Sequence, residues 1–95
     1  MAVTVRLPGA LAEATGGVTK VEAKGGSLRE LVADLERRYP ALEGRILDRS
    51  GAMPAHVSVF IGEADARDVG GAAARVPDGA LVMVIPAMAG GADRA

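Results

Sequence analysis

The sequence predicts an α+β fold in which a mixed sheet of four to five strands packs on one main helix. Apolar and polar residues alternate at the start of the chain and again in residues 56–61, as they do in half-buried strands. After Ser27, large apolar residues recur at helical spacing instead. With 95 residues and a net charge of −1, the chain has the length of one domain with one modest core.

The first half of the chain is predicted to form a strand hairpin and then the main helix. Residues 2–7 alternate in polarity, and residues 18–23 alternate again after a glycine turn. Ser27 and Glu30 match the S-x-x-E capping box that begins a helix, and Pro40 ends it. The predicted buried side carries Leu28, Leu31, Val32, Leu35 and Tyr39, and the predicted solvent side carries Arg29, Glu30, Asp34, Glu36, Arg37 and Arg38.

The second half predicts two further strands, over residues 56–61 and 80–85. The last one is apolar on both faces and follows the Pro77-Asp78-Gly79 turn. The remaining expectations are one helical turn over residues 42–47, a loop over 48–54, a charged turn over 63–68 with a short edge strand nearby, and a stop at Pro86. With the first and last strands side by side in the sheet centre, this order is the β-grasp (ubiquitin-like) arrangement. Residues 1–86 would form the domain and residues 87–95 a flexible C-terminal tail.

Composition argues against catalysis and against nucleic-acid binding. The chain has no cysteine, one histidine (His56) and two aromatic residues, so we expect no thiolate chemistry, metal site or base-stacking surface. The acids Glu63, Asp65 and Asp68 are interpreted as a solvated turn. Eleven basic and twelve acidic residues alternate along the chain, which predicts neither nucleic-acid nor membrane binding. The lack of cysteine, signal peptide and apolar span predicts a cytoplasmic protein.

The Gly90-Gly91 pair is not explained by a turn between two predicted elements. It follows an apolar strand, Pro86 and a spacer of mostly small residues, an ending typical of ubiquitin-like proteins. Glycine has no Cβ and accepts most backbone angles, so such an end can enter a channel too narrow for side chains. The folded domain would then be a handle, and the chemistry would take place at its C-terminal end.

On these features the chain resembles the ThiS/MoaD family of ubiquitin-like sulfur carriers, and most nearly its CysO-like branch. The resemblance rests on Val3-Thr4-Val5, the helix entry Ser27-Leu28, the strand at residues 57–61 and, above all, residues 78–91. It implies a carrier protein, not an enzyme, that binds no cofactor itself.

The resemblance also implies the partners and the role of the tail. An E1-like adenylyltransferase and sulfurtransferase would use ATP to adenylate Gly91 and convert it to a thiocarboxylate, with Ala89 and Gly90 threading the enzyme's channel. A sulfur-accepting synthase would then take the sulfur. Cysteine biosynthesis is the first expectation, and molybdopterin, thiamine or a sulfur-containing natural product are the alternatives. A ubiquitin-like protein modifier or a non-catalytic β-grasp interaction module is the alternative function.

Residues 92–95 depart from the family pattern, in which carriers end at Gly-Gly. While Ala92 follows Gly91, Gly91 has no free carboxylate to be activated. We favour removal of residues 92–95 by a peptidase, such as a JAMM-type metallopeptidase. An artificial extension of the chain and a loss of carrier activity are the two alternatives.

A partner-binding surface is predicted on the outer face of the sheet. If alternate residues of the last strand face the helix, then Leu81, Met83 and Ile85 face outward beside Phe60. A sheet face in water is normally polar, so four clustered apolar residues indicate a site for a protein partner. A loop that covers the strand, or dimerisation of the carrier, would equally account for an apolar outer face.

Overall fold

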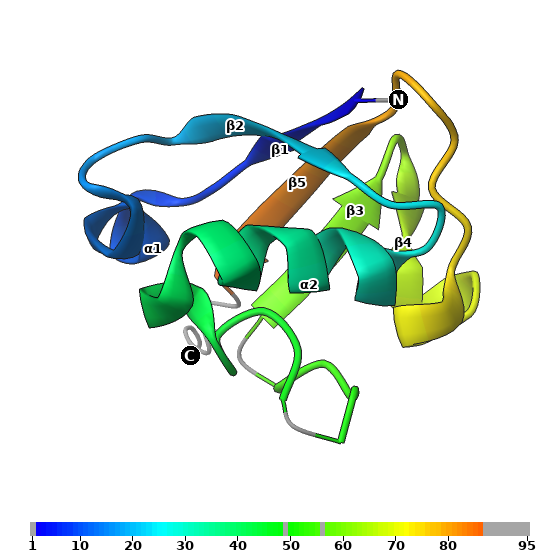
Figure 1. Ribbon diagram of the computed structural model, residues 1–95. Coiled ribbons are helices and arrows are strands. Elements are labelled where there is room, and N and C mark those ends of the chain that lie inside the picture. The colour runs from blue at the N-terminus through cyan, green and yellow to red at the C-terminus, as the bar shows by residue number, and fades with distance from the viewer. Residues whose placement is uncertain (1, 49, 56, 87–95) are drawn as a thin grey trace.

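Five strands form one mixed sheet in the part of the chain that the computed structural model describes, which is residues 2–48, 50–55 and 57–86. The strands are β1 (Ala2–Arg6), β2 (Lys20–Lys24), β3 (Val57–Ile61), β4 (Ala64–Asp65) and β5 (Leu81–Pro86). Their spatial order is β2-β1-β5-β3-β4 (Figure 1). The first and last strands are parallel neighbours in the centre, and the other pairs are antiparallel. This confirms the predicted β-grasp arrangement.

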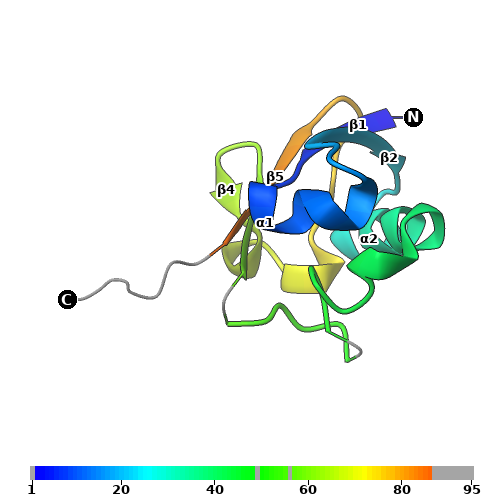
Figure 2. The same cartoon turned by 90° about the vertical axis from the view of Figure 1, so that its left-hand side faces the viewer.

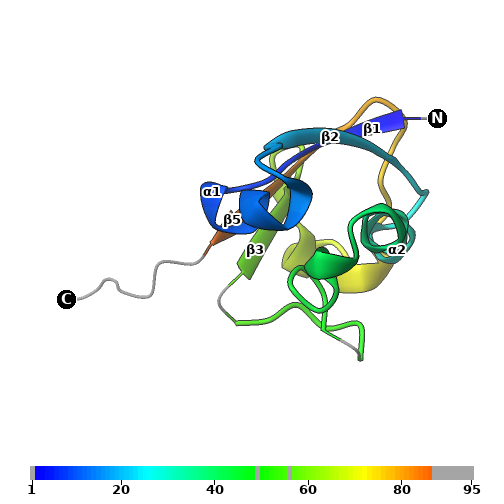
Figure 3. The same ribbon diagram turned by 60° about the vertical axis from the view of Figure 1, so that its left-hand side comes forward.

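The helix α2 (Leu28–Arg38) packs across one face of the sheet, and Figure 3 shows the two layers from the side. The predicted cap forms, because the Ser27 hydroxyl accepts a hydrogen bond from the Glu30 amide at 3.2 Å. The Glu30 carboxylate accepts from the Gly26 amide at 3.0 Å, one residue earlier than a standard capping box requires. Gly25 lets the chain pass close to the helix, since a Cβ there would lie 2.5 Å from the Leu31 nitrogen.

The core lies between the sheet and α2. Alternate residues of the strands point into it, and the apolar side of α2 meets them. Its largest fully buried members are Leu28, Leu31, Leu35, Leu42, Ile46, Val3, Val5, Val59 and Val82. This single core matches the prediction from chain length.

Two predictions in the first half are wrong in detail. Asp34 is buried, at 7% exposure, and does not lie on the solvent side of the helix. Strand β2 begins at Lys20 rather than at residue 18, and Val18 is exposed. The sequence also did not indicate the short helix α1 (Gly9–Ala12) and the 3₁₀ turn η1 (Glu13–Thr15). Figure 2 brings α1 to the front, near the end of β5.

The connections of the second half are short 3₁₀ turns. The turn η2 (Pro40–Leu42) comes earlier than the predicted residues 42–47, although Leu42, Ile46 and Leu47 are buried. The turns η3 (Ala66–Asp68) and η4 (Gly71–Ala73) follow the predicted edge strand. The last strand includes Pro86, opposite Val57, instead of ending before it. Within the described residues, no helix has the length and apolar character that a membrane crossing requires.

Candidate functional site

The outer face of the sheet, on the side away from α2, carries the four apolar residues that the sequence placed there. The β3–β5 register sets Phe60 opposite Met83 and Ser58 opposite Ile85, and β5 sets Leu81 beside Thr4 of β1. Leu81 and Ile85 are 38% and 37% exposed, while Met83 and Phe60 are half-buried. We call Phe60, Leu81, Met83 and Ile85 the apolar patch. Its predicted placement is confirmed, and its role as a partner-binding surface remains a prediction.

The apolar patch forms because β5 is apolar on both faces. Val82 and Val84 point into the core, so their neighbours must point outward along the pleat. Contact between these apolar side chains and water is unfavourable. Clusters of this kind mark interaction sites in monomeric proteins. Met83 adds an unbranched side chain that adapts to more than one contact surface.

The predicted sulfur-attachment residues follow β5, the middle strand of the sheet, in the sequence. The predicted residues Ala89, Gly90 and Gly91 lie outside the described residues, and Pro86 is the last described residue. Strand β5 is hydrogen-bonded on both sides, to β1 and to β3. A partner that binds the segment after Pro86 therefore binds next to a strand that is held in place on both sides.

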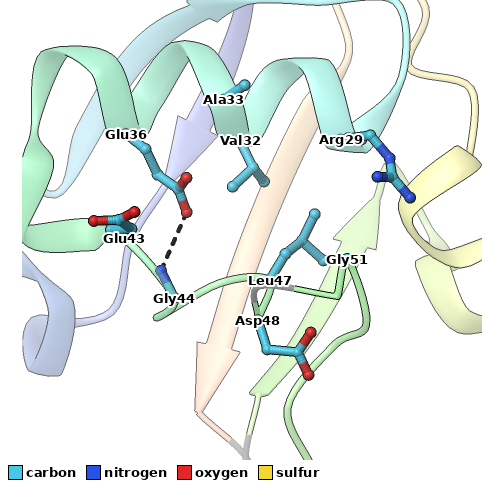
Figure 4. Close-up of a pocket in the computed structure, with 9 residues that line it drawn as sticks. All are labelled: Arg29, Val32, Ala33, Glu36, Glu43, Gly44, Leu47, Asp48 and Gly51. Atoms are coloured by element: carbon cyan, nitrogen blue, oxygen red, sulfur yellow. Dashed lines mark hydrogen bonds between the residues drawn. The ribbon is translucent and has the colours of Figure 1, made fainter.

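The hollow between α2 and the loop that follows it is lined by polar side chains, of which Glu36 and Asp48 accept hydrogen bonds from the loop (Figure 4). Its volume is about 520 Å³. The Glu36 carboxylate accepts a hydrogen bond from the Gly44 amide at 3.3 Å. The Ser50 hydroxyl and then the Ala52 amide lower the pKa of Asp48 below its ordinary value. These groups are already satisfied by loop contacts and are not positioned as a nucleophile with a base.

No metal centre is formed by the described residues, among which no cluster of three or more His, Cys, Asp or Glu side chains occurs. The only histidine in the sequence, His56, lies outside the described residues. The predicted solvated turn forms as expected, since the Asp65 carboxylate accepts a hydrogen bond from the Arg67 amide at 2.9 Å.

Asp34 joins the helix to the free edge of the sheet, a role that the sequence did not reveal. Strand β2 is an edge strand, and its Lys24 amide donates to the Asp34 carboxylate at 3.0 Å. Arg38 donates both to Asp34, at 3.1 Å, and to the Glu22 carbonyl of the same edge. Desolvation raises the pKa of Asp34, but the Lys24 amide and the positive charges of Arg38 and Arg37 together lower it. The one sequence signal of this role was its place three residues after Leu31, at the border of the apolar stripe.

Known proteins match this chain along nearly its whole length. The model of the ThiS family matches residues 5–91. Sulfur carrier protein CysO of Mycobacterium tuberculosis (strain ATCC 25618 / H37Rv) is 38% identical over 93 residues, which cover 96% of this chain and 100% of that protein. A chain of the Amycolatopsis orientalis BexX/CysO complex has a TM-score of 0.86 at 37% identity, covering 94% of this chain and 99% of that chain. The crystal structure of M. tuberculosis CysO has a TM-score of 0.85 at 35% identity, covering 90% and 99%. The chain therefore belongs to the ThiS family.

Proposed function

We propose that this chain, a sulfur carrier protein rather than an enzyme, carries its sulfur as a thiocarboxylate on Gly91. The observation that carries the proposal is the family match, which begins at residue 5 and ends at Gly91. The 38% identity to a protein named as a sulfur carrier supports the same role. The folded domain, whose last strand lies in the middle of the sheet, gives the partner enzymes a rigid surface to bind.

The proposed chemistry takes place in partner enzymes. A carboxylate oxygen of Gly91 attacks the α-phosphorus of ATP in an E1-like adenylyltransferase, and pyrophosphate leaves. A sulfur nucleophile at the oxidation level of sulfide then attacks the acyl carbon, and AMP leaves. In a sulfur-accepting synthase, the thiocarboxylate sulfur attacks an electrophilic carbon of the substrate and forms a thioester. Hydrolysis of the bond between the acyl carbon and sulfur then leaves the sulfur on the substrate and restores the Gly91 carboxylate. The carrier itself holds no cofactor in this scheme, and ATP is consumed by the activating enzyme.

The segment after Pro86 has a length suited to this task. Residues 87–91 span at most about 18 Å when extended. That reach lets the domain dock outside the activating enzyme while Gly91 enters the nucleotide site. Ala89 and Gly90 have small side chains or none, so they present little obstruction to a narrow channel.

The proposal requires hydrolysis of the peptide bond between Gly91 and Ala92. A JAMM-type zinc metallopeptidase is the class of enzyme we propose for this step, since its product is a free Gly91 carboxylate. For the acceptor we propose a synthase of cysteine biosynthesis. The BexX/CysO complex supports binding of a second protein, because a chain of it closely resembles this one.

The test uses three chains expressed in the native host: residues 1–95, 1–91 and 1–90. An alkylating probe for thioacids reports the thiocarboxylate, and circular dichroism reports the fold. We expect labelling of the first two chains and none of the third, with the fold unchanged in all three. Equal labelling of residues 1–90 would place the sulfur elsewhere. Isopeptide ladders with cellular proteins, without any thioacid, would instead indicate a protein modifier.

A further inference from the structure

Two cations lie side by side on the outer face, next to the apolar patch. The β1–β2 register sets Arg6 directly opposite Lys20, and the β1–β5 register sets Arg6 beside Met83. Both cations are exposed. One cross-strand row therefore runs from Lys20 through Arg6 and Met83 to Phe60, and passes from two positive charges to two apolar side chains.

This arrangement opposes folding of the free protein. Like charges directly opposite each other on antiparallel strands destabilise the pair. The ion pairs within the described residues join Asp34 to two arginines of α2, and neither Arg6 nor Lys20 takes part in one. Glu22 is the next acidic residue along β2, but it stands opposite Thr4. No ion pair within the described residues therefore offsets the repulsion between the two cations.

Arg6 lines two hollows of the surface. One, of about 340 Å³, is lined by both cations together with Thr4 and Leu81. The other, of about 330 Å³, is lined by Arg6 and by apolar residues that include Met83 and Ile85. A side chain that enters the first hollow meets two positive charges, and a side chain that enters the second meets an apolar wall. The two hollows therefore select for different chemistry at adjacent positions.

We propose that Arg6 and Lys20 together bind a carboxylate side chain of the protein partner that docks on the apolar patch. The proposal rests on the proposed function, which requires an activating enzyme, and on the prediction that this enzyme docks on the apolar patch. An arginine donates two parallel hydrogen bonds to a carboxylate, and the nearby lysine adds a second positive charge. The occupant is a partner segment with Asp or Glu next to apolar residues, which satisfies both hollows at once.

The cations lie near the end of β5, so a contact with them would orient the partner relative to the segment after Pro86. Pro86 lies three residues beyond Met83, and so about 10 Å along β5. A carboxylate held by Arg6 and Lys20 fixes the orientation of the partner close to where residues 87–91 continue. Charges at the rim of an interface act mainly on the rate and the salt dependence of association.

The first part of the test needs no partner. Lys20→Glu replaces the like-charged pair by an Arg6–Glu pair, so its melting temperature should rise by about 1 to 8 °C. Lys24→Glu makes the same charge change on the same strand and face, opposite Ala2, and should give no rise. A melting temperature of Lys20→Glu at or below that of the wild type would overturn the claim that the pair is unfavourable in the free protein.

The second part measures the rate of thiocarboxylate formation in the native host for the same variants. Lys20→Glu should slow it about tenfold, whereas Lys24→Glu should stay near the wild type. Equal rates for Lys20→Glu and Lys24→Glu would overturn the carboxylate contact and leave the proposed function intact. Absence of thiocarboxylate in every chain, the wild type included, would instead contradict the proposed function.

Discussion

Replacing Asp34 by alanine should destabilise the domain far more than its place on a charged helix suggests. The substitution leaves the Lys24 amide on the free edge of β2 without its 3.0 Å acceptor. A hydrogen bond to a charged group contributes about 1.5 to 3 kcal/mol to stability. The ion pairs with Arg37 and Arg38 add about 0.3 to 0.5 kcal/mol each, because the Arg37 side chain is largely exposed and that of Arg38 partly exposed. The free energy of unfolding should therefore fall by about 2 to 4 kcal/mol in total.

The assay is urea denaturation, with Arg37→Ala as the matched control. That control removes only the ion pair of an arginine whose side chain is 72% exposed, and should lower stability by about 0.5 kcal/mol or less. In thermal unfolding, Asp34→Ala should lower the melting temperature by about 8 °C or more. Equal destabilisation by the two variants would refute the reasoning that Asp34 secures the edge of the sheet.

The same residue predicts a dependence of stability on pH. The pKa of Asp34 is lowered in the folded state, so its contribution is fully present above the unfolded pKa of about 3.9. It is lost as pH falls through the still lower folded pKa. The stability difference between wild type and Asp34→Asn should therefore shrink in the acid window below about pH 4. A difference that stays constant over this window would show that the charge of Asp34 contributes nothing.

Three further predictions concern the carrier end, the apolar patch and the helix entry. In the chain that ends at Gly91, Gly90→Val should leave the melting temperature unchanged and abolish ATP–pyrophosphate exchange by the activating enzyme. Normal exchange by this variant would contradict the narrow channel. Met83→Asp and Phe60→Asp should both weaken partner binding in a titration. Met83→Asp should destabilise the fold less, because the new carboxylate lies beside Arg6, whereas a carboxylate at position 60 lies opposite Asp65. The opposite order in urea denaturation would contradict the register. Gly25→Ala should lower the free energy of unfolding by about 1 to 3 kcal/mol, because its Cβ would lie 2.5 Å from the helix backbone. Gly26→Ala should be nearly neutral, since the atom nearest to its Cβ is 3.7 Å away. Equal urea midpoints for the two variants would contradict this.

The fold was largely predictable from sequence because its main elements carry strong local signals. Residues 2–7 alternate cleanly, Ser27 caps the helix, and the last strand is apolar on both faces. The helix α1 was missed because it is four residues long and its cap, Pro8, makes no side-chain hydrogen bond. Asp34 was assigned to solvent because polarity alone does not reveal a hydrogen bond to a strand ten residues earlier.

The candidate site was predictable only in part, because some of its neighbouring residues lie on different strands. Alternation along β5 was enough to place Leu81, Met83 and Ile85 on the outer face. The cation pair was not predictable in this way, since Arg6 and Lys20 are brought together by the register of two strands and joined to the patch by a third. Register depends on how the whole sheet assembles, so neighbours across strands become visible only in the structure.

The central claim is that this sulfur carrier works through the carboxyl group of Gly91. The intact mass of the protein recovered from its native host, with and without an alkylating probe for thioacids, tests it most directly. We predict a species that ends at Gly91 and carries one oxygen-to-sulfur exchange. A chain in which Ala92 still follows Gly91, without thioacid under any sulfur supply, would contradict the account.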